Sequence, residues 1–248
     1  LGFSLQHFRS GNGRGTTKGF AYLRERAEAA GIFVLLIGNL GSHHSALNVE
    51  LFRGFALSDK VAPFVVINDQ DSERAWSFTL LHELAHIWLG QTGVSGGRPT
   101  STIETFCNDV AGRILLPTAE IANEVALRGV SQDLVMARIH EIAELRQVSH
   151  SMVAYKLYRQ GVIDHGMWSS VTAVFRQQWL NDKVAQRERA RENEGGPSYY
   201  LVRRHRLGNR LLGLSKRMLS EGSLSPSKAA AILGVKPNIV FSLTDGVA

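Results

Sequence analysis

The chain has 248 residues, with 28 Lys and Arg against 22 Asp and Glu, which gives a net charge of +6 and a pI near 9.7. Hydrophobic residues make up 44% and charged residues 20%, values close to those of folded domains, so disorder of the whole chain is excluded. The longest purely apolar run, Ile32 to Ile37, is far shorter than the roughly 20 residues that cross a bilayer. We therefore expect no membrane-spanning segment and no membrane partner.

A single cysteine, Cys107, excludes an intramolecular disulfide and fits a reducing cytoplasm, where we expect the protein to act. We expect the thiol itself to be a packing residue. The first residues contain no basic segment leading into a long apolar run, so no signal peptide is predicted. Because the sequence starts at Leu1 instead of Met, we expect residues upstream to be removed or not included.

The N-terminal half of the sequence predicts a mixture of helices and short strands. The first fifteen or so residues end in three closely spaced glycines, Gly11, Gly13 and Gly15, and have few apolar anchors, so we expect them to be unstructured. Apolar periodicity and punctuation by Gly, Ser and Pro then predict a helix over 19–30, a strand over 32–37, a hairpin of strands over 52–57 and 63–67, a helix over 74–89 capped by Ser72, a loop over 93–100 and a helix over 103–116.

The C-terminal half predicts helices alone. Their expected ranges are 119–127, 132–146, 150–160, 168–191, 199–220 and 227–233. A charged run over 187–194 that ends in Gly195, Gly196 and Pro197 indicates a hinge or domain boundary. The sequence as a whole therefore predicts an α+β fold, with a small twisted sheet followed by a mostly helical C-terminal region.

The segment His82-Glu-Leu-Ala-His86 carries the clearest chemical signal. Two histidines four residues apart lie one above the other on one face of a helix, where both can bind one metal ion. Glu83 then lies beside the open coordination position. The alternative is a buried helix whose histidines bond to backbone carbonyls and whose Glu83 is solvated. A rigid amphipathic helix favours the metal site, and we expect the metal to be Zn²⁺.

A catalytic zinc ion needs a third protein ligand, and Glu104 is the candidate. It begins the helix predicted after a Gly-rich loop, which is long enough to bring that helix alongside the first. Asn108 lies four residues further on the same helical face, where it can orient a liganding histidine through the free ring N–H. The alternative for Glu104 is a carboxylate placed at a helix N-terminus by the helix dipole.

Four segments, taken in order, resemble the ImmA/IrrE family of zinc metallopeptidases; they span 52–55, 63–68, 78–86 and 104–117. That family has an HExxH helix with a glutamate as the third ligand, so the resemblance implies the same roles for His82, His86 and Glu104. The sequence departs from the family pattern at Cys107, where Ala is usual, and at Val110, where Phe is usual. Both changes keep a small or apolar group.

The resemblance implies a minimal zincin-like peptidase core over 1–128. Weaker likeness over 146–157, 195–200 and 224–243 suggests a helix-turn-helix-like region over 129–194 and a basic helical region over 195–248. Members of the family are cytoplasmic proteins that cleave, or trigger cleavage of, helix-turn-helix repressors. The resemblance therefore implies a zinc endopeptidase whose substrate is a helix-turn-helix repressor or antitoxin, and whose activity derepresses stress or mobile-element genes.

The mechanism expected from these residues uses Glu83 as a general base, which takes a proton from water and delivers it to the departing amine. The oxyanion donor stays open among four polar residues, Arg53, Arg74, His150 and Tyr155, each of which also fits a structural role. We expect the substrate to bind extended, by adding to a free edge of the strand pair 52–67.

Two other classes of function compete with the peptidase. The stretch 183–217 contains ten basic and three acidic residues, a net charge of +7, and the helix pairs over 132–160 and 225–243 resemble DNA-binding modules, so weak DNA contact through the basic C-terminal region is possible on charge alone. The other alternative is a non-proteolytic regulator with a structural zinc site. Glu83→Gln separates it from a peptidase, since a structural site has no use for that carboxylate.

Overall fold

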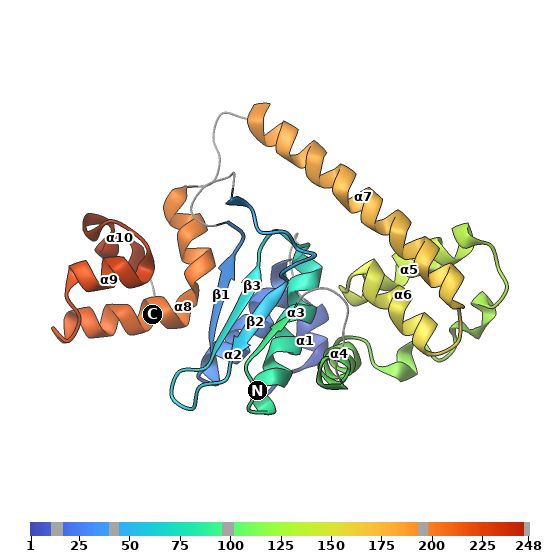
Figure 1. Cartoon of the computed structure of the whole chain (residues 1–248), viewed down its shortest axis with the longest axis horizontal. Coiled ribbons are helices and arrows are strands. Elements are labelled where there is room, and N and C mark those ends of the chain that lie inside the picture. The colour runs from blue at the N-terminus through green and yellow to red at the C-terminus, as the bar shows by residue number, and fades with distance from the viewer. Residues whose placement is uncertain (11–16, 40–44, 96–101, 193–197, 246–248) are drawn as a thin grey trace.

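The computed structural model describes residues 1–10, 17–39, 45–95, 102–192 and 198–245. Its centre is a mixed four-stranded sheet in the order β1-β3-β2-β4, formed by β1 (Phe33–Ile37), β2 (Gly54–Leu57), β3 (Phe64–Asn68) and β4 (Gly93–Ser95). β1 runs parallel to β3, whereas β2 runs antiparallel to both of its neighbours. A small sheet with helices around it and a helical C-terminal region confirms the α+β class (Figure 1).

Helices make up most of the remaining described chain. They are α1 (Leu5–Arg9), α2 (Thr17–Ala29), α3 (Glu73–Trp88), α4 (Thr102–Leu115), α5 (Gln132–Arg146), α6 (His150–Arg159), α7 (His165–Glu192), α8 (Tyr199–Ser220), α9 (Pro226–Leu233) and α10 (Val240–Thr244), with 3-10 turns η2 (Thr118–Glu120), η3 (Glu124–Leu127) and η4 (Pro237–Ile239). In the part of the chain that the structure describes, no helix is both long and apolar enough to cross a bilayer.

Three local predictions differ from the structure. The N-terminus is not unstructured throughout, because α1 forms and buries Phe8. The predicted helix over 119–127 is wrong: two short 3-10 turns take its place, and only Ile121 of that stretch is buried, too little apolar surface to hold a helix. The predicted loop over 93–100 begins with strand β4. The predicted hinge at 195–197 and the three N-terminal glycines lie outside the described residues.

The predicted hairpin is confirmed, but its proposed free edge is wrong. β2 and β3 pair antiparallel, with Phe55 opposite Val66. β3 also pairs with β1, and β2 also pairs with β4, so neither strand of the hairpin has an unpaired side. The order of strands places β4 at one end of the described sheet and β1 at the other.

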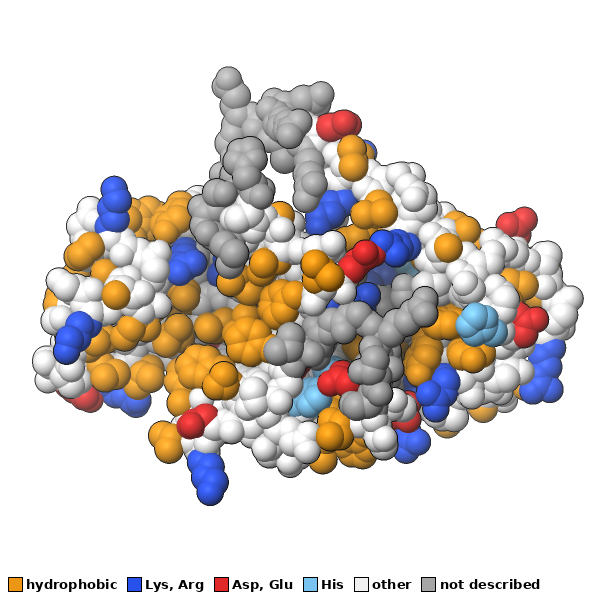
Figure 2. Space-filling view, in the orientation of Figure 1, with side chains coloured by type: hydrophobic (Ala, Val, Ile, Leu, Met, Phe, Trp, Pro, Cys, Tyr) orange, Lys and Arg blue, Asp and Glu red, His pale blue; other side chains and the backbone are white. Residues whose placement is uncertain are grey.

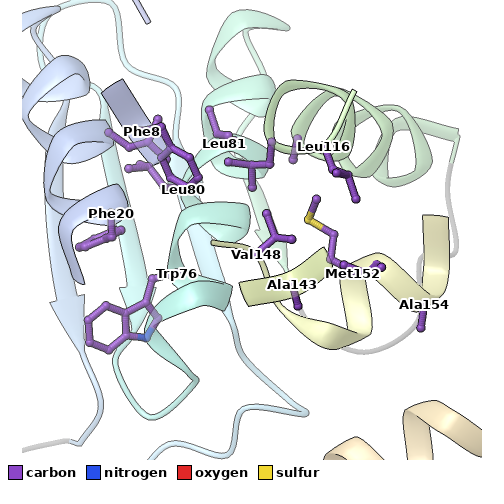
Figure 3. Close-up of a cluster of buried hydrophobic side chains, with 14 of the residues drawn as sticks. Phe8, Phe20, Trp76, Leu80, Leu81, Leu116, Ala143, Val148, Met152 and Ala154 are labelled. Atoms are coloured by element: carbon purple, nitrogen blue, oxygen red, sulfur yellow. The ribbon is translucent and has the colours of Figure 1, made fainter. Parts of the chain in front are cut away.

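The main hydrophobic core joins the sheet to the first helices and to α5 and α6 (Figure 3). Phe20 of α2 packs edge-on against Trp76 of α3, with ring centroids 5.4 Å apart. Val148 and Met152, from the turn before α6 and from α6 itself, belong to the same cluster as Leu80 of α3. The peptidase-like core and the helical region after it therefore share one packed interior, which fixes the position of α3.

A second apolar cluster holds the C-terminal helices together. It lies among α8, α9 and α10 and includes Leu212, Leu233 and Leu243, all fully buried. Two arginines of α8 reach the carbonyl ends of the short helices: Arg203 donates to Leu233 O at 2.6 Å and Arg204 to Leu243 O at 2.9 Å. These bonds satisfy carbonyl groups that a helix leaves open at its C-terminus.

A buried arginine ties α8 to the sheet. Arg24 of α2 donates to Val34 O in β1 and to His205 O in α8, both at 2.5 Å, and pairs with Glu28 at 3.4 Å. Burial lowers the pKa of Arg24 and raises that of Glu28, although each charge partly offsets the other's shift. The helical path of α8 breaks at Gly208, where φ is +77°, directly against this ion pair.

We predict that Gly208→Ala lowers the free energy of unfolding by about 2 to 4 kcal/mol. A Cβ there would lie 2.3 Å from Glu28 Oε1 and 2.5 Å from Arg24 Nη2, on a backbone conformation that alanine rarely adopts. Urea denaturation followed by circular dichroism measures the loss. Gly166→Ala is the control, because Gly166 is exposed on α7 and a Cβ there would lie 3.4 Å from its neighbour Asp164 Oδ1. An equally large loss of stability in the control would refute the explanation.

Candidate metal centre

The candidate site is built on α3, a helix with defined ends and a buried inner face. Ser72 caps its N-terminus by accepting a hydrogen bond from Ala75 N at 3.3 Å. The helix packs on β2 and β3 on one side and on α4 on another. His82, Glu83 and His86 are 4%, 0% and 2% exposed, so the structure places all three in the interior. The solvated Glu83 of the alternative interpretation is therefore wrong.

Three donor groups converge between α3 and α4. His82 Nε2 lies 3.2 Å from Glu104 Oε2, His86 Nε2 lies 3.1 Å from Glu104 Oε1, and the two Nε2 atoms lie 3.2 Å apart. The three residues that the sequence suggested as ligands are thus brought together, across the loop that precedes α4. Among the described residues, neither histidine bonds to a backbone carbonyl; their Nε2 atoms face one another and the carboxylate of Glu104.

The spacing of these donors fits a metal ion. Ligands at 2.0–2.1 Å from a tetrahedral ion lie about 3.3 Å from one another, close to the separations found between His82, His86 and Glu104. Two imidazoles and one carboxylate are also the donor set of known open catalytic zinc sites, which leave one position for water. The residues present therefore fit a divalent metal ion such as zinc.

Asn108 holds one of the histidines in the orientation that such a site requires. Its Oδ1 lies 3.0 Å from His82 Nδ1, so the ring N–H at Nδ1 donates to the amide and Nε2 keeps its lone pair toward the site. Burial lowers the pKa of His82, while the nearby Glu104 opposes that shift. The neutral imidazole that a metal ligand needs is thereby favoured.

Two glycines let the sheet approach α3 closely. A Cβ on Gly54 of β2 would lie 2.7 Å from Thr79 Cγ2 and 3.0 Å from Glu83 Oε1. A Cβ on Gly93 of β4 would lie 2.9 Å from His86 Cε1 and Nδ1. Sequence reasoning did not assign a role to either glycine. Gly54 lies within a segment that carries the family likeness, which was the one available signal.

The suggested oxyanion donors have partners elsewhere. Arg74 donates to both carboxylate oxygens of Glu144, at 2.6 and 2.7 Å. His150 Nε2 lies 3.0 Å from His140 Nδ1, and the Tyr155 hydroxyl accepts a hydrogen bond from Arg159. The charge of Arg53 acts on Asp71 and opposes the rise that burial causes in the pKa of that carboxyl. The hydrogen bonds of Arg74, His150 and Tyr155 give these three residues a structural role.

Cys107 lies at the site, a position that sequence reasoning assigned to packing. It is fully buried on α4, and its Sγ belongs with a ring nitrogen of each histidine, His82 and His86, to a group of atoms within 4.8 Å of one another. Burial, followed by the charges of Glu104 and Glu83, raises the pKa of the thiol to about 11. The signal in the sequence was its place three residues after Glu104, on the same face of the helix.

We predict that Asn108→Ala weakens metal binding about 10- to 100-fold, because His82 loses the partner that fixes its ring and tautomer. Competition with a chromophoric chelator measures the affinity. Asp109→Ala, on the next position of α4, is the control and should bind metal as the unaltered chain does. Equal affinity of the Asn108 variant and the control would show that the amide does not position the histidine.

We predict that substitution of Gly93 affects metal binding, whereas substitution of Gly54 affects turnover. Gly93→Ala pushes against His86 and is expected to weaken metal binding by about 10-fold or more. Gly54→Ala pushes against Glu83, so we expect metal affinity to be kept while peptide cleavage falls by about 10-fold or more. Chelator competition and cleavage assays on both variants check this, and reduced metal affinity in the Gly54 variant alone would contradict it.

A comparison with protein families agrees with this geometry. The family model Peptidase_M78, described as the IrrE N-terminal-like domain, matches residues 28–158, which is more than half of the chain. The matched segment contains all three converging residues as well as Glu83 and Asn108. In the same comparisons no curated protein and no solved structure matched the chain.

Proposed function

The chain belongs to the Peptidase_M78 family, and on that premise we propose that it is a zinc-dependent endopeptidase. Its substrate in this proposal is a helix-turn-helix repressor or antitoxin, which it cleaves at one site in the cytoplasm to derepress stress or mobile-element genes. The observation that supports the enzymatic part of this proposal is the convergence of His82, His86 and Glu104. Glu83, which follows His82 in the sequence, is fully buried.

His82, His86 and Glu104 would hold the divalent metal, which would supply Lewis-acid polarisation of a carbonyl and lower the pKa of water beside it. The chain's own contribution to proton transfer is Glu83, which takes the proton of the attacking water and gives it to the departing amine. Its carboxylate lies close to β2, where the absent Cβ of Gly54 leaves it room. Asn108 keeps His82 in the tautomer that binds.

Strand β4 is the surface on which we propose that the substrate binds. Among the described residues it is the strand at one end of the sheet, and its Gly93 lies against His86. An extended peptide that adds to β4 by main-chain hydrogen bonds therefore passes the metal ligands. Phe106, on the helix that carries Glu104, is 50% exposed and offers an apolar contact for a substrate side chain.

Such backbone pairing selects little sequence, so selectivity needs a further surface. Figure 2 shows hydrophobic side chains gathered on the face that overlies the sheet and α8, whereas Lys and Arg side chains on that face are scattered singly. This face therefore offers apolar surface to a folded protein partner and no continuous row of basic groups to a phosphate backbone.

DNA binding is the weaker alternative for two reasons. Of the candidate recognition helix α6, only Ser151 and Arg159 are exposed, because the helix packs against α5 and α7. Basic side chains of α8 are also engaged within the protein: Arg206 pairs with Asp69 at 2.6 Å, and Arg210 lies over the ring of Phe33. Few of these charges are left to contact phosphates.

The test is co-expression of the chain with the helix-turn-helix repressor encoded beside it, with the intact mass of the partner as the readout. We expect two fragments whose masses sum to the intact partner plus one water. Glu83→Gln should lower cleavage by about 100-fold or more while metal content stays the same. Glu73→Gln, at the start of the same helix, is the matched control and should cleave normally.

Two outcomes would contradict the proposal in different ways. An intact partner with the unaltered chain, loaded with zinc, would contradict this substrate. Equal cleavage by the Glu83 and Glu73 variants would contradict the role of Glu83 and favour a regulator with a structural zinc site.

A further inference from the structure

The buried thiol of Cys107 lies on the metal side of α4. It is three residues from Glu104 and next to Asn108, so the face of the helix that presents the carboxylate also presents the sulfur. Its Sγ, a ring nitrogen of His82 and a ring nitrogen of His86 lie within 4.8 Å of one another. All three side chains are buried.

A buried cysteine is ordinary as a packing residue, and the neighbours of Cys107 distinguish it from one. Two histidines at 4% and 2% exposure face the same region as the sulfur, and their Nε2 atoms converge on Glu104. The thiol therefore lies among the groups that would surround the metal ion.

The distances allow the sulfur to reach a metal ion. With Zn–S near 2.3 Å and Zn–N near 2.0 Å, tetrahedral sulfur and nitrogen ligands lie about 3.6 Å apart. The sulfur lies within 4.8 Å of a ring nitrogen of each histidine, so a shift of about 1 Å, by rotation of the short Cys107 side chain, would bring it to this separation.

We propose that Cys107 is a fourth protein ligand of the metal that His82, His86 and Glu104 hold, so that the resting site is closed. This inference rests on the proposed metal centre. When the metal binds, the thiol releases its proton to solvent and the sulfur–metal bond forms, with no change of oxidation state. Four protein ligands leave no position for water, which makes the resting protein a latent peptidase.

A site closed by Cys107 would account for both interpretations of the zinc site, the structural one and the catalytic one. While sulfur is bound, the centre has the four protein ligands typical of a structural site. If a substrate displaced the sulfur, which would take up a proton and return to the thiol, His82, His86 and Glu104 would hold the metal as in a catalytic site, with Glu83 beside the position that the sulfur leaves. The substrate that can displace the thiolate is then selected by its binding along β4 and not by the metal alone.

The test uses Co²⁺ in place of zinc, because its absorption spectrum reports the ligands directly. The metal-free full chain is loaded with Co²⁺, and spectra are compared for the unaltered protein, Cys107→Ala and Cys107→Ser. We expect visible bands of a four-coordinate ion in all three, and a near-ultraviolet sulfur-to-cobalt charge-transfer band in the unaltered protein alone. Circular dichroism confirms that the variants are folded.

Azide, which enters an open coordination position, tests the closure. We expect azide to shift the visible bands of Cys107→Ala and to leave those of the unaltered protein unchanged; equal shifts in both would overturn the closed site. Visible bands without a charge-transfer band in the unaltered protein would overturn sulfur ligation and leave the proposed peptidase intact. No cobalt bands in any of the three proteins would overturn the metal centre and, with it, both proposals.

Discussion

The structure depends on one electrostatic constraint: three lone-pair donors from two helices meet in a buried space. Two imidazole nitrogens and a carboxylate within 3.2 Å of one another repel unless a cation or a shared proton lies between them. The surrounding chain holds them there. Asn108 fixes the first histidine, and the absence of a side chain at Gly54 and Gly93 lets β2 and β4 close against α3. A divalent cation between the three donors would turn this repulsion into attraction.

The rest of the fold holds α3 and α4 in fixed positions relative to each other. The main core continues without a break from Phe8 to Phe175, so the helical region after the peptidase-like segment buttresses the site. The matched family segment likewise runs to residue 158, past the expected end of the core at residue 128. Arg24, which pairs with Glu28, hydrogen-bonds to both β1 and α8 and so connects α8 to the sheet. The three-part division of the chain stays a prediction.

The convergence of His82, His86 and Glu104 could be predicted from the sequence because helical geometry determines much of it, whereas their role as metal ligands stays a prediction. Spacing of four residues places His82 over His86, and the same spacing places Asn108 over Glu104, so the donors were foreseeable once two adjacent helices were assigned. Strand β4 was missed because it has only three residues, with no alternation of apolar and polar side chains. These residues form a strand through their pairing with β2. The place of Cys107 was missed because a small buried residue has the same pattern whether it packs against carbon or faces a metal. Such features depend on contacts between segments that local periodicity does not encode.

The central claim is that His82, His86 and Glu104 hold one divalent metal ion. The most direct measurement is a crystal structure of the zinc-loaded chain with anomalous diffraction recorded on both sides of the zinc absorption edge. We predict one strong peak about 2.0 to 2.2 Å from both Nε2 atoms and from a carboxylate oxygen of Glu104. A chain that binds zinc only elsewhere, for example at the cluster of His140, Glu144 and His150, would contradict the account.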